Sequence, residues 1–315
     1  MASKELQRRL RNALREDRYK DELLGLVEGT TGSIFYVSST SSTSSASNTG
    51  ESPDEALTTL DLAMAKCTAN VGDIVVLMPG HNEGSSAAAT WDIDVAGVTV
   101  VGLGHGSARP RFDFDNAAAS IDIGANGCVL RNITLMPSIT DVLVGIDVET
   151  TITDTLLEDI EALPGEDAAG VDDFAVVVDI KVGCTRTTVR GLKVRQHASG
   201  AGYIAGVQLN GASDDVTVEG CDIYILGAGV LAPINGLTTL STNFRARNNT
   251  LMTDAEPCIE MFTGTTGILQ NNHCFTNLAT IDAAIVADGC ANFDNLYVEV
   301  APEAGAGIGT LSVDD

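Results

Sequence analysis

Two sets of related residues recur along the chain at nearly constant spacing, and this repeat constrains the fold more than any other feature. The first column follows short apolar runs and contains Asn132, Asp159, Gly191, Gly220, Asn248, Asn271 and Asn295. The second column leads the first by 10 to 13 residues and contains Asp122, Asp147, Asp179, Gln208, Asn235 and Glu260. Repeats of about 23–32 residues that hold short strands and no helical periodicity predict a β-solenoid.

Apolar–polar–apolar triplets orient the second column on this solenoid. In Ile121-Asp122-Ile123 the alternation turns both isoleucines inward and the acid outward. Adjacent turns lie about 4.8 Å apart, so equivalent residues stack along the axis. A stack of Asp122, Asp147 and Asp179 would be repulsive without cations, a basic partner or high salt. Ca²⁺ suits such oxygen ligands, and solvated acids on a screened surface are the alternative.

Shorter segments flank the repeats. Residues 1–30 are expected to form a basic amphipathic helical anchoring arm, with its helix over 3–27, and residues 31–50 a Ser/Thr-rich linker. Residues 51–72 are expected to form a capping helix, because Ser52, Pro53 and Glu55 have the form of a capping box. This helix would cover the exposed edge of the first turn. The parallel β-helix is expected at 73–300, and a Gly/Ala-rich acidic C-terminal tail at 301–315.

The arm carries a narrow apolar stripe with cations beside it. Residues 1–28 hold seven basic and six acidic groups, which gives +1, and the remainder holds 11 basic and 37 acidic groups, which gives −26. An arm of this kind suits docking, and a solvated helix lying on its own domain is the alternative. The residues expected to anchor the chain to a partner are Leu6, Arg8, Arg9, Leu10, Arg11, Leu14 and Arg15.

The net charge of −25 argues against nucleic-acid binding, which needs a basic surface. Dense Asp with few Lys resembles proteins of salt-loving organisms, and a merely acidic surface is the alternative. No apolar run approaches the roughly 20 residues that span a bilayer, so no membrane partner is expected. The seven cysteines lack the spacing of a disulfide framework, and we interpret them as reduced thiols that pack in the core.

Few residues offer chemistry for cleaving a polysaccharide. Asp113 and Asp115 alternate on one strand face about 7 Å apart, near the range for paired glycosidase carboxylates. Trp91 could stack on a sugar ring, with packing inside a turn as the alternative. His81 and His105 lie 24 residues apart and could share a metal, although two ligands do not make a site. No catalytic residue and no cofactor are therefore assigned, and the question of enzyme activity stays open.

The order of motifs resembles a known family. "YVSSTSSTSSASNTGESPDEAL", a cap helix, "GDIVVLMPGH" and then turns marked by Asn and Gly are similar to right-handed parallel β-helix proteins of the pectate-lyase-like kind, over about residues 34–300. They resemble in particular the versions found in structural proteins of tailed viruses. The resemblance implies an all-β, right-handed parallel β-helix with an N-terminal capping helix and an extra helical arm.

The same resemblance implies a function, since the fold by itself does not settle one. The expected function is a non-enzymatic virion protein that decorates or cements the capsid exterior of a tailed virus, with a salt-loving host. The expected partners are the major capsid protein and, by the resemblance, two further copies in a homotrimer. The alternative is a tail spike or fibre that binds or cleaves host-surface polysaccharide, as a lyase or glycoside hydrolase. A cellular adhesin-like solenoid is a third reading.

Overall fold

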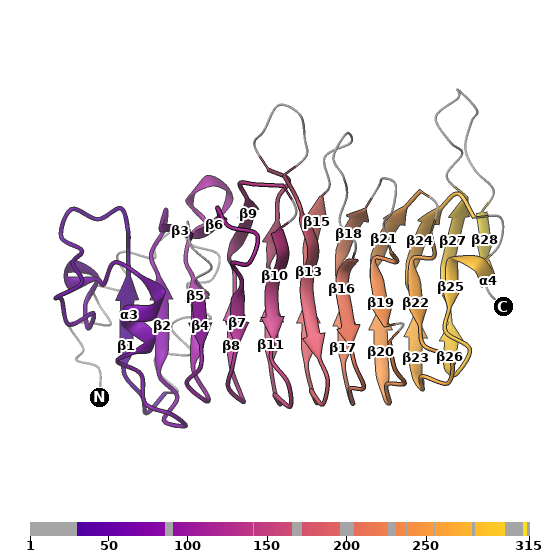
Figure 1. Cartoon of the computed structure of the whole chain (residues 1–315), viewed down its shortest axis with the longest axis horizontal. Coiled ribbons are helices and arrows are strands. Elements are labelled where there is room, and N and C mark those ends of the chain that lie inside the picture. Colours follow the sequence, from indigo (N-terminus) through magenta and orange to yellow (C-terminus); the bar gives the residue numbers. More distant parts are fainter. Residues whose placement is uncertain are drawn as a thin grey trace.

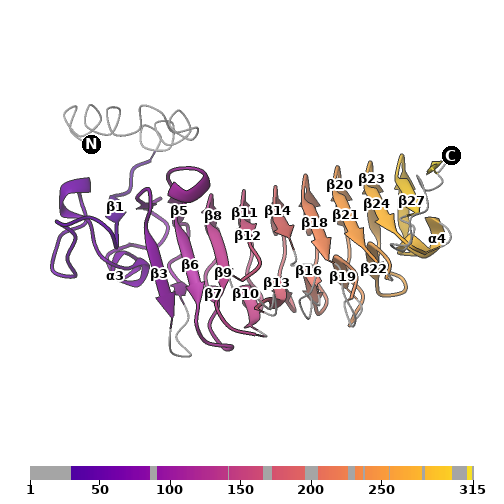
Figure 2. The same ribbon diagram turned by 90° about the horizontal axis from the view of Figure 1, so that it is seen from above.

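The computed structural model describes residues 30–85, 91–140, 142–165, 172–195, 205–225, 231–236, 238–254, 256–278, 281–299 and 311–313. In these segments the chain winds through three sheets in turn, and successive turns lie side by side from the N-terminal to the C-terminal end (Figure 1, Figure 2). Every described strand pair is parallel except the last, β27 with β28. The fold is therefore a parallel β-solenoid, as the repeat predicts.

The strands are named here by sheet. Sheet A contains β1 (Ile34–Val37), β2 (Ile74–Leu77), β5 (Thr99–Gly102), β8 (Val129–Arg131), β11 (Leu156–Glu158), β14 (Thr188–Arg190), β17 (Thr217–Glu219), β20 (Phe244–Arg247), β23 (Gly267–Gln270) and β26 (Cys290–Phe293). Sheet B contains β3 (Asn82–Ser85), β6 (Arg111–Phe114), β9 (Thr134–Pro137), β12 (Glu161–Ala162), β15 (Lys193–Arg195), β18 (Asp222–Ile225), β21 (Thr250–Thr253), β24 (His273–Thr276), β27 (Leu296–Glu299) and β28 (Leu311–Val313). Sheet C contains β4 (Trp91–Ile93), β7 (Ile121–Ile123), β10 (Val142–Val148), β13 (Phe174–Lys181), β16 (Ala205–Asn210), β19 (Ile234–Gly236), β22 (Ile259–Met261) and β25 (Ile285–Val286).

Two ends of the predicted domain map are corrected by these strands. The segment predicted as a linker at 31–50 contains β1, which pairs with β2 from Ile34 to Val37, so the solenoid begins inside it. Within the predicted tail, β28 runs antiparallel to β27, with Leu296 opposite Val313. Such pairing covers the last edge of sheet B, which would otherwise expose free backbone groups.

The predicted continuous helix over 51–72 is wrong. The structure has a 3-10 turn, η1 (Pro53–Glu55), and then a short helix, α3 (Leu60–Met64). Ser52 makes no side-chain capping bond, whereas the Thr59 hydroxyl accepts a hydrogen bond from the Leu62 N–H. Helix α3 packs against β1, β2 and β4, with Leu60 and Met64 in the core. The other short helices among the described residues are η2 (Gly106–Ala108) and α4 (Ile281–Ala284). No helix in the described part of the chain is long and apolar enough to cross a membrane.

The register confirms the second repeat column. Asp122 on β7 lies opposite Asp147 on β10, which lies opposite Asp179 on β13, and the column continues through Gln208, Asn235 and Glu260. It begins one turn earlier than predicted, at Asp92 on β4. On β7, Ile121 and Ile123 are fully buried and Asp122 is half-buried, so burial alternates there as predicted. The core is thus a stack of Val, Ile and Leu along the axis.

The first repeat column marks the turn between sheets A and B, and its last member is corrected. The backbone is left-handed at Asn132, Asp159, Gly191, Gly220, Asn248, Asn271 and Asp294, where Gly, Asn and Asp are the tolerated residues. The sequence placed Asn295 in this column, but the left-handed residue is Asp294. Asn295 instead belongs to a buried ladder with Asn249 and Asn272, whose side chains bond from turn to turn at 2.9 Å.

All seven cysteines carry free thiols, as predicted, and five of them are buried. Cys128, Cys184 and Cys221 each follow a glycine at the start of a turn or strand and face the core. Burial raises the pKa of each of these three thiols, which disfavours the reactive thiolate. Their role is packing.

Candidate functional site

Three acids of the second repeat column, Asp122, Asp147 and Asp179, are half-buried or buried on sheet C and have partners within the chain. Lys181 Nζ lies 2.6 Å from Asp147 Oδ2 and 3.0 Å from Glu149 Oε1. Asp179 accepts a hydrogen bond from Asn210 Nδ2 at 3.2 Å, and Asp122 accepts one from Ser120 Oγ at 2.6 Å. Lys181 supplies a cation to Asp147, whereas the donors to Asp122 and Asp179 are neutral, so the expected need for further cations or salt stays a prediction. The solvated alternative is wrong for Asp147 and Asp179, which are 8% and 5% exposed.

Burial raises the pKa of Asp122, Asp147 and Asp179 above the usual aspartate value, and like charges nearby add to the shift. Hydrogen bonds from Ser120, Lys181 and Asn210 partly offset it. Among the described residues, no group of three or more His, Cys, Asp or Glu side chains has the geometry to hold a metal ion. The expected binding of Ca²⁺ to this column stays a prediction.

A buried network around Glu83 accounts for two of the candidate residues. Trp91 Nε1 donates to Glu83 Oε1 at 3.0 Å, and the Leu60 N–H at the start of α3 donates to Oε2 at 3.0 Å. His81 Nδ1 accepts from the Ser39 N–H at 3.0 Å, so its Nε2 is the nitrogen that donates to Glu83 Oε2 at 3.2 Å. The network joins α3 to the first strands of sheets B and C, and no sequence pattern indicates Glu83 as its centre.

Trp91 packs inside the first turns. Its ring meets the rings of Phe112 and Phe114 edge to face, both at 5.1 Å between centroids, and only 3% of the residue is exposed. A stacking platform for sugar needs an open ring face, so the packing alternative is correct. Asp113 on β6 is paired with Arg111 at 2.7 Å, and Asp115 follows the end of that strand. His105 is exposed at the start of η2, whereas His81 is buried in the Glu83 network, so the expected pair of metal ligands is not observed among the described residues.

A ladder of alternating charge crosses five turns of sheet A, and the sequence analysis missed it. Arg131, Glu158, Arg190, Glu219 and Arg247 occupy equivalent positions on β8, β11, β14, β17 and β20. Glu158 lies 3.3 Å from Arg131 and 3.1 Å from Arg190, and Glu219 lies 2.6 Å from both Arg190 and Arg247. Each member directly precedes a residue of the first repeat column, so a check of that position for sign alternation would have found it.

Internal pairing accounts for most cations of the solenoid. Residues 29–315 contain 11 Lys and Arg, all within described segments. Nine of them form ion pairs with acids of the same solenoid: Arg109, Arg111, Arg131, Lys181, Arg186, Arg190, Arg195, Arg245 and Arg247. The seven basic groups of residues 1–28 and all the predicted anchoring residues lie outside the described segments.

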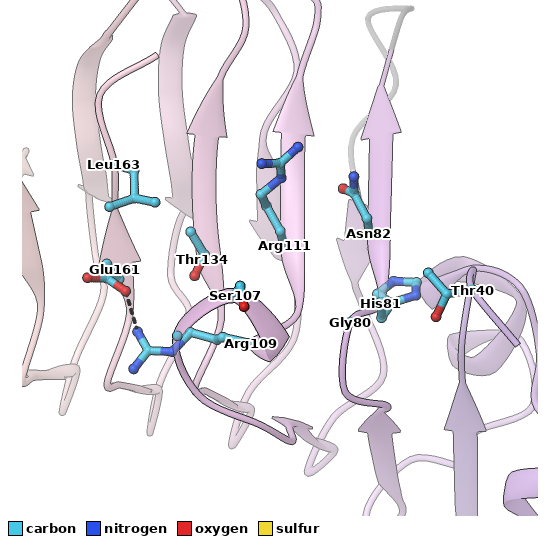
Figure 3. Close-up of a pocket in the computed structure, with 11 residues that line it drawn as sticks. Thr40, Gly80, His81, Asn82, Ser107, Arg109, Arg111, Thr134, Glu161 and Leu163 are labelled. Carbon is cyan, nitrogen blue, oxygen red and sulfur yellow. Dashed lines mark hydrogen bonds and ion pairs between the residues drawn. The ribbon is translucent and has the colours of Figure 1, made fainter. Parts of the chain in front are cut away.

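A cavity of about 550 Å³ lies on the outer face of sheet B near the N-terminal end (Figure 3). It is lined by Thr40, Gly80, His81, Asn82, Gly106, Ser107, Arg109, Arg111, Thr134, Glu161 and Leu163. Its floor is a column of four residues in register on consecutive turns, Asn82, Arg111, Thr134 and Glu161. The floor therefore brings together polar side chains that are up to 79 residues apart in the sequence, from Asn82 to Glu161.

The loop between β5 and β6 forms one wall of this cavity. Gly104 has a φ of 97°, and a Cβ there would lie 2.4 Å from the Ala108 carbonyl oxygen, so the tight loop requires glycine. Arg109 leaves the end of this loop and reaches Glu161 on β12, with 3.0 Å between Nη1 and Oε2. Figure 3 shows this pair on one side of the cavity and Arg111, His81 and Asn82 across from it.

Comparison with known proteins supports the fold. No protein-family model matches the chain, and a search of curated proteins found no match. Among solved structures, pectate lyase Pel9A is similar with a TM-score of 0.56 and 13% sequence identity, over 89% of this chain and 80% of that one. A rhamnogalacturonan lyase is similar with a TM-score of 0.43 and 12% identity, over 78% of this chain and 74% of that one. At this identity the first likeness shows the fold alone. The chain therefore has a parallel β-helix fold similar to that of pectate lyase Pel9A.

Proposed function

We propose that this chain is a non-enzymatic structural protein that decorates or cements the capsid exterior of a tailed virus. One observation carries the proposal: the solenoid uses nine of its 11 cations in its own ion pairs, while residues 1–28 concentrate seven more. A solenoid with a net charge of −26 is repelled by an acidic shell. The arm is therefore the part of the chain suited to attach it.

Attachment through the arm would use two kinds of contact. Leu6, Leu10 and Leu14 would bury their apolar stripe on the major capsid protein. Arg8, Arg9, Arg11 and Arg15 would pair with its carboxylates, which arginine binds in a bidentate geometry.

Trp91 and Asp113, two of the candidates for saccharide chemistry, make contacts inside the solenoid that support a structural role for it. Trp91 and Glu83 hold the first turns together, and Asp113 is engaged with Arg111. Each of these groups serves the scaffold in the contacts described above. A homotrimer is part of the proposal by resemblance, and light scattering of the purified protein tests it.

Location and copy number in purified particles test the proposal directly. A decoration protein is present in proportion to the major capsid protein, and cryo-electron microscopy would place it over the shell. A tail spike would appear in few copies at one vertex, and that result would overturn the proposal. The salt-loving host is tested separately: the melting temperature of the protein should rise between 0.1 M and 1 M NaCl as its self-repulsion is screened.

A glycan-binding or glycan-cleaving spike is the second candidate. The polar cavity on sheet B favours it, as does the likeness to a protein named a pectate lyase. Release of oligosaccharides from host-surface polysaccharide by the purified protein would establish this candidate in place of the first.

A further inference from the structure

The outer face of sheet B carries an apolar surface on the C-terminal turns of the solenoid. On β18, β21, β24 and β27, one outward position in register holds only aliphatic or aromatic side chains (Figure 2). We call these residues the apolar column: Tyr224, Met252, Phe275 and Val298. With turns about 4.8 Å apart, the column spans roughly 14 Å along the axis.

The column faces away from the core. Its members alternate along each strand with buried residues, such as Ile223 before Tyr224 and Cys274 before Phe275. Each of the four members is partly exposed. Soluble proteins rarely leave a continuous apolar surface open to water, so the column has the character of an interaction surface.

Arg195 on β15 marks the N-terminal end of the column. Its guanidinium lies 4.0 Å from the centroid of the Tyr224 ring, and it pairs with Asp222 at 2.5 Å. Tyr, Phe, Met and Arg are the residues that are enriched at protein–protein interfaces, whereas Lys, Glu and Asp are depleted there. The composition of this surface therefore fits a protein partner.

The charge of this face favours a second copy of the same chain as that partner. The two outward positions on each of β15, β18, β21, β24 and β27 contain one acid, Asp222, and Arg195 pairs with it. On sheet C, by contrast, the second repeat column holds five acids in seven positions. Two solenoids that each carry −26 repel one another least where their acids are fewest.

We propose that copies of this chain pack against one another through this face of sheet B, with the apolar column at the centre of the contact. The inference rests on the self-association in the proposed function, and it adds the surface that performs it. Burying Met252 and Phe275 in the contact removes apolar area from water, while Thr250 and His273 beside them supply a polar rim.

Analytical ultracentrifugation of full-length proteins tests this surface. Phe275→Lys puts a charge in the middle of the column, and Met252→Lys does so one turn earlier, from an equivalent partly exposed position. Phe293→Lys is the matched control, because Phe293 is 52% exposed on β26 of sheet A. We expect each column variant to raise the dissociation constant of the oligomer at least about tenfold, and the control to leave it within about twofold.

The outcomes separate the surface from the wider proposal. A full-length protein that sediments as a monomer would overturn both the surface and the homotrimer, while the location of the protein in particles would still decide the capsid role. An oligomer that survives both column substitutions, or that dissociates with Phe293→Lys, would overturn the surface alone. Leu10→Lys in the predicted arm should leave the oligomer intact, and dissociation of that variant would assign the contact to the arm instead. Far-ultraviolet circular dichroism that matches the parent protein would show that the dissociated variants are folded.

Discussion

Replacing Asn272 with alanine is expected to destabilise the C-terminal turns more than the loss of a small side chain suggests. Asn272 is fully buried, and its Nδ2 donates to the Ala246 carbonyl and to Asn295 Oδ1, both at 2.9 Å. Its Oδ1 accepts from Asn249 Nδ2 at 2.9 Å. The Asn249 N–H also donates to this Oδ1 at 3.3 Å, so four hydrogen bonds are lost. At about 1 kcal/mol each they amount to about 4 kcal/mol, and their buried partner groups are left without Asn272. We expect the free energy of unfolding to fall by about 4 kcal/mol.

The neighbouring Asn271 offers a matched control. Its side chain is exposed and bonds to Asn248, and its backbone φ of 53° suits glycine. Asn271→Gly should therefore change stability by less than about 0.5 kcal/mol. Urea unfolding followed by circular dichroism measures both variants, and hydrogen exchange should show the earliest opening at β23 and β24 in the alanine variant. If Asn272→Ala costs no more than Asn271→Gly, the ladder does not stabilise these turns and the reasoning fails.

Three further changes test other contacts. Glu219→Gln removes two ion pairs of the sheet A ladder and should lower the free energy of unfolding by about 1 kcal/mol at 0.1 M NaCl. The difference should vanish at 1 M NaCl, and an equal loss at both salt levels would contradict an ionic origin. Leu60→Asp puts a charge on the buried face of α3 and should aggregate on purification, whereas Asp115→Ala should stay soluble. Burial raises the pKa of Asp179, so the folded state holds the proton more tightly and stability falls as pH rises above the unfolded value of 3.8. Asp179→Asn should then raise the melting temperature at pH 7 and change it little at pH 3, and a lower melting temperature at pH 7 would refute this assignment.

The repeat predicted the solenoid because stacked strands demand periodic sequence. Asp122, Asp147 and Asp179 fall in register since each lies between two aliphatic residues that must face the core. The error at Asn295 has a local cause. "DN" supplies two adjacent polar residues, and only the backbone shows that Asp294 takes the left-handed turn while Asn295 turns inward.

The capping helix failed because a tertiary contact overrides a local pattern. Ser52-Pro53-Asp54-Glu55 does start a 3-10 turn, but Leu57 then forms a bridge with Val37 and the chain leaves the helical path. The helix restarts at Leu60 after Thr59, where the capping hydroxyl is found.

The polar cavity could not be predicted from local sequence. Arg109 and Glu161 are 52 residues apart, and they meet because η2 shapes a loop that reaches across two turns. No local pattern in "GLGHGSARPRF" predicts that Arg109 contacts Glu161. The charge ladder of sheet A was open to prediction from the repeat, since its five members share one position in it.

The proposed capsid attachment is tested by binding of the purified protein to empty shells assembled from a tailed-virus major capsid protein. The comparison is between the full-length chain and a variant in which Arg8, Arg9, Arg11 and Arg15 are all replaced by Gln. Equal melting temperatures would show that the solenoid is intact in both. We expect the full-length protein to co-sediment with the shells and the variant to stay in the supernatant. Failure of the full-length protein to bind, or equal binding by the variant, would contradict it.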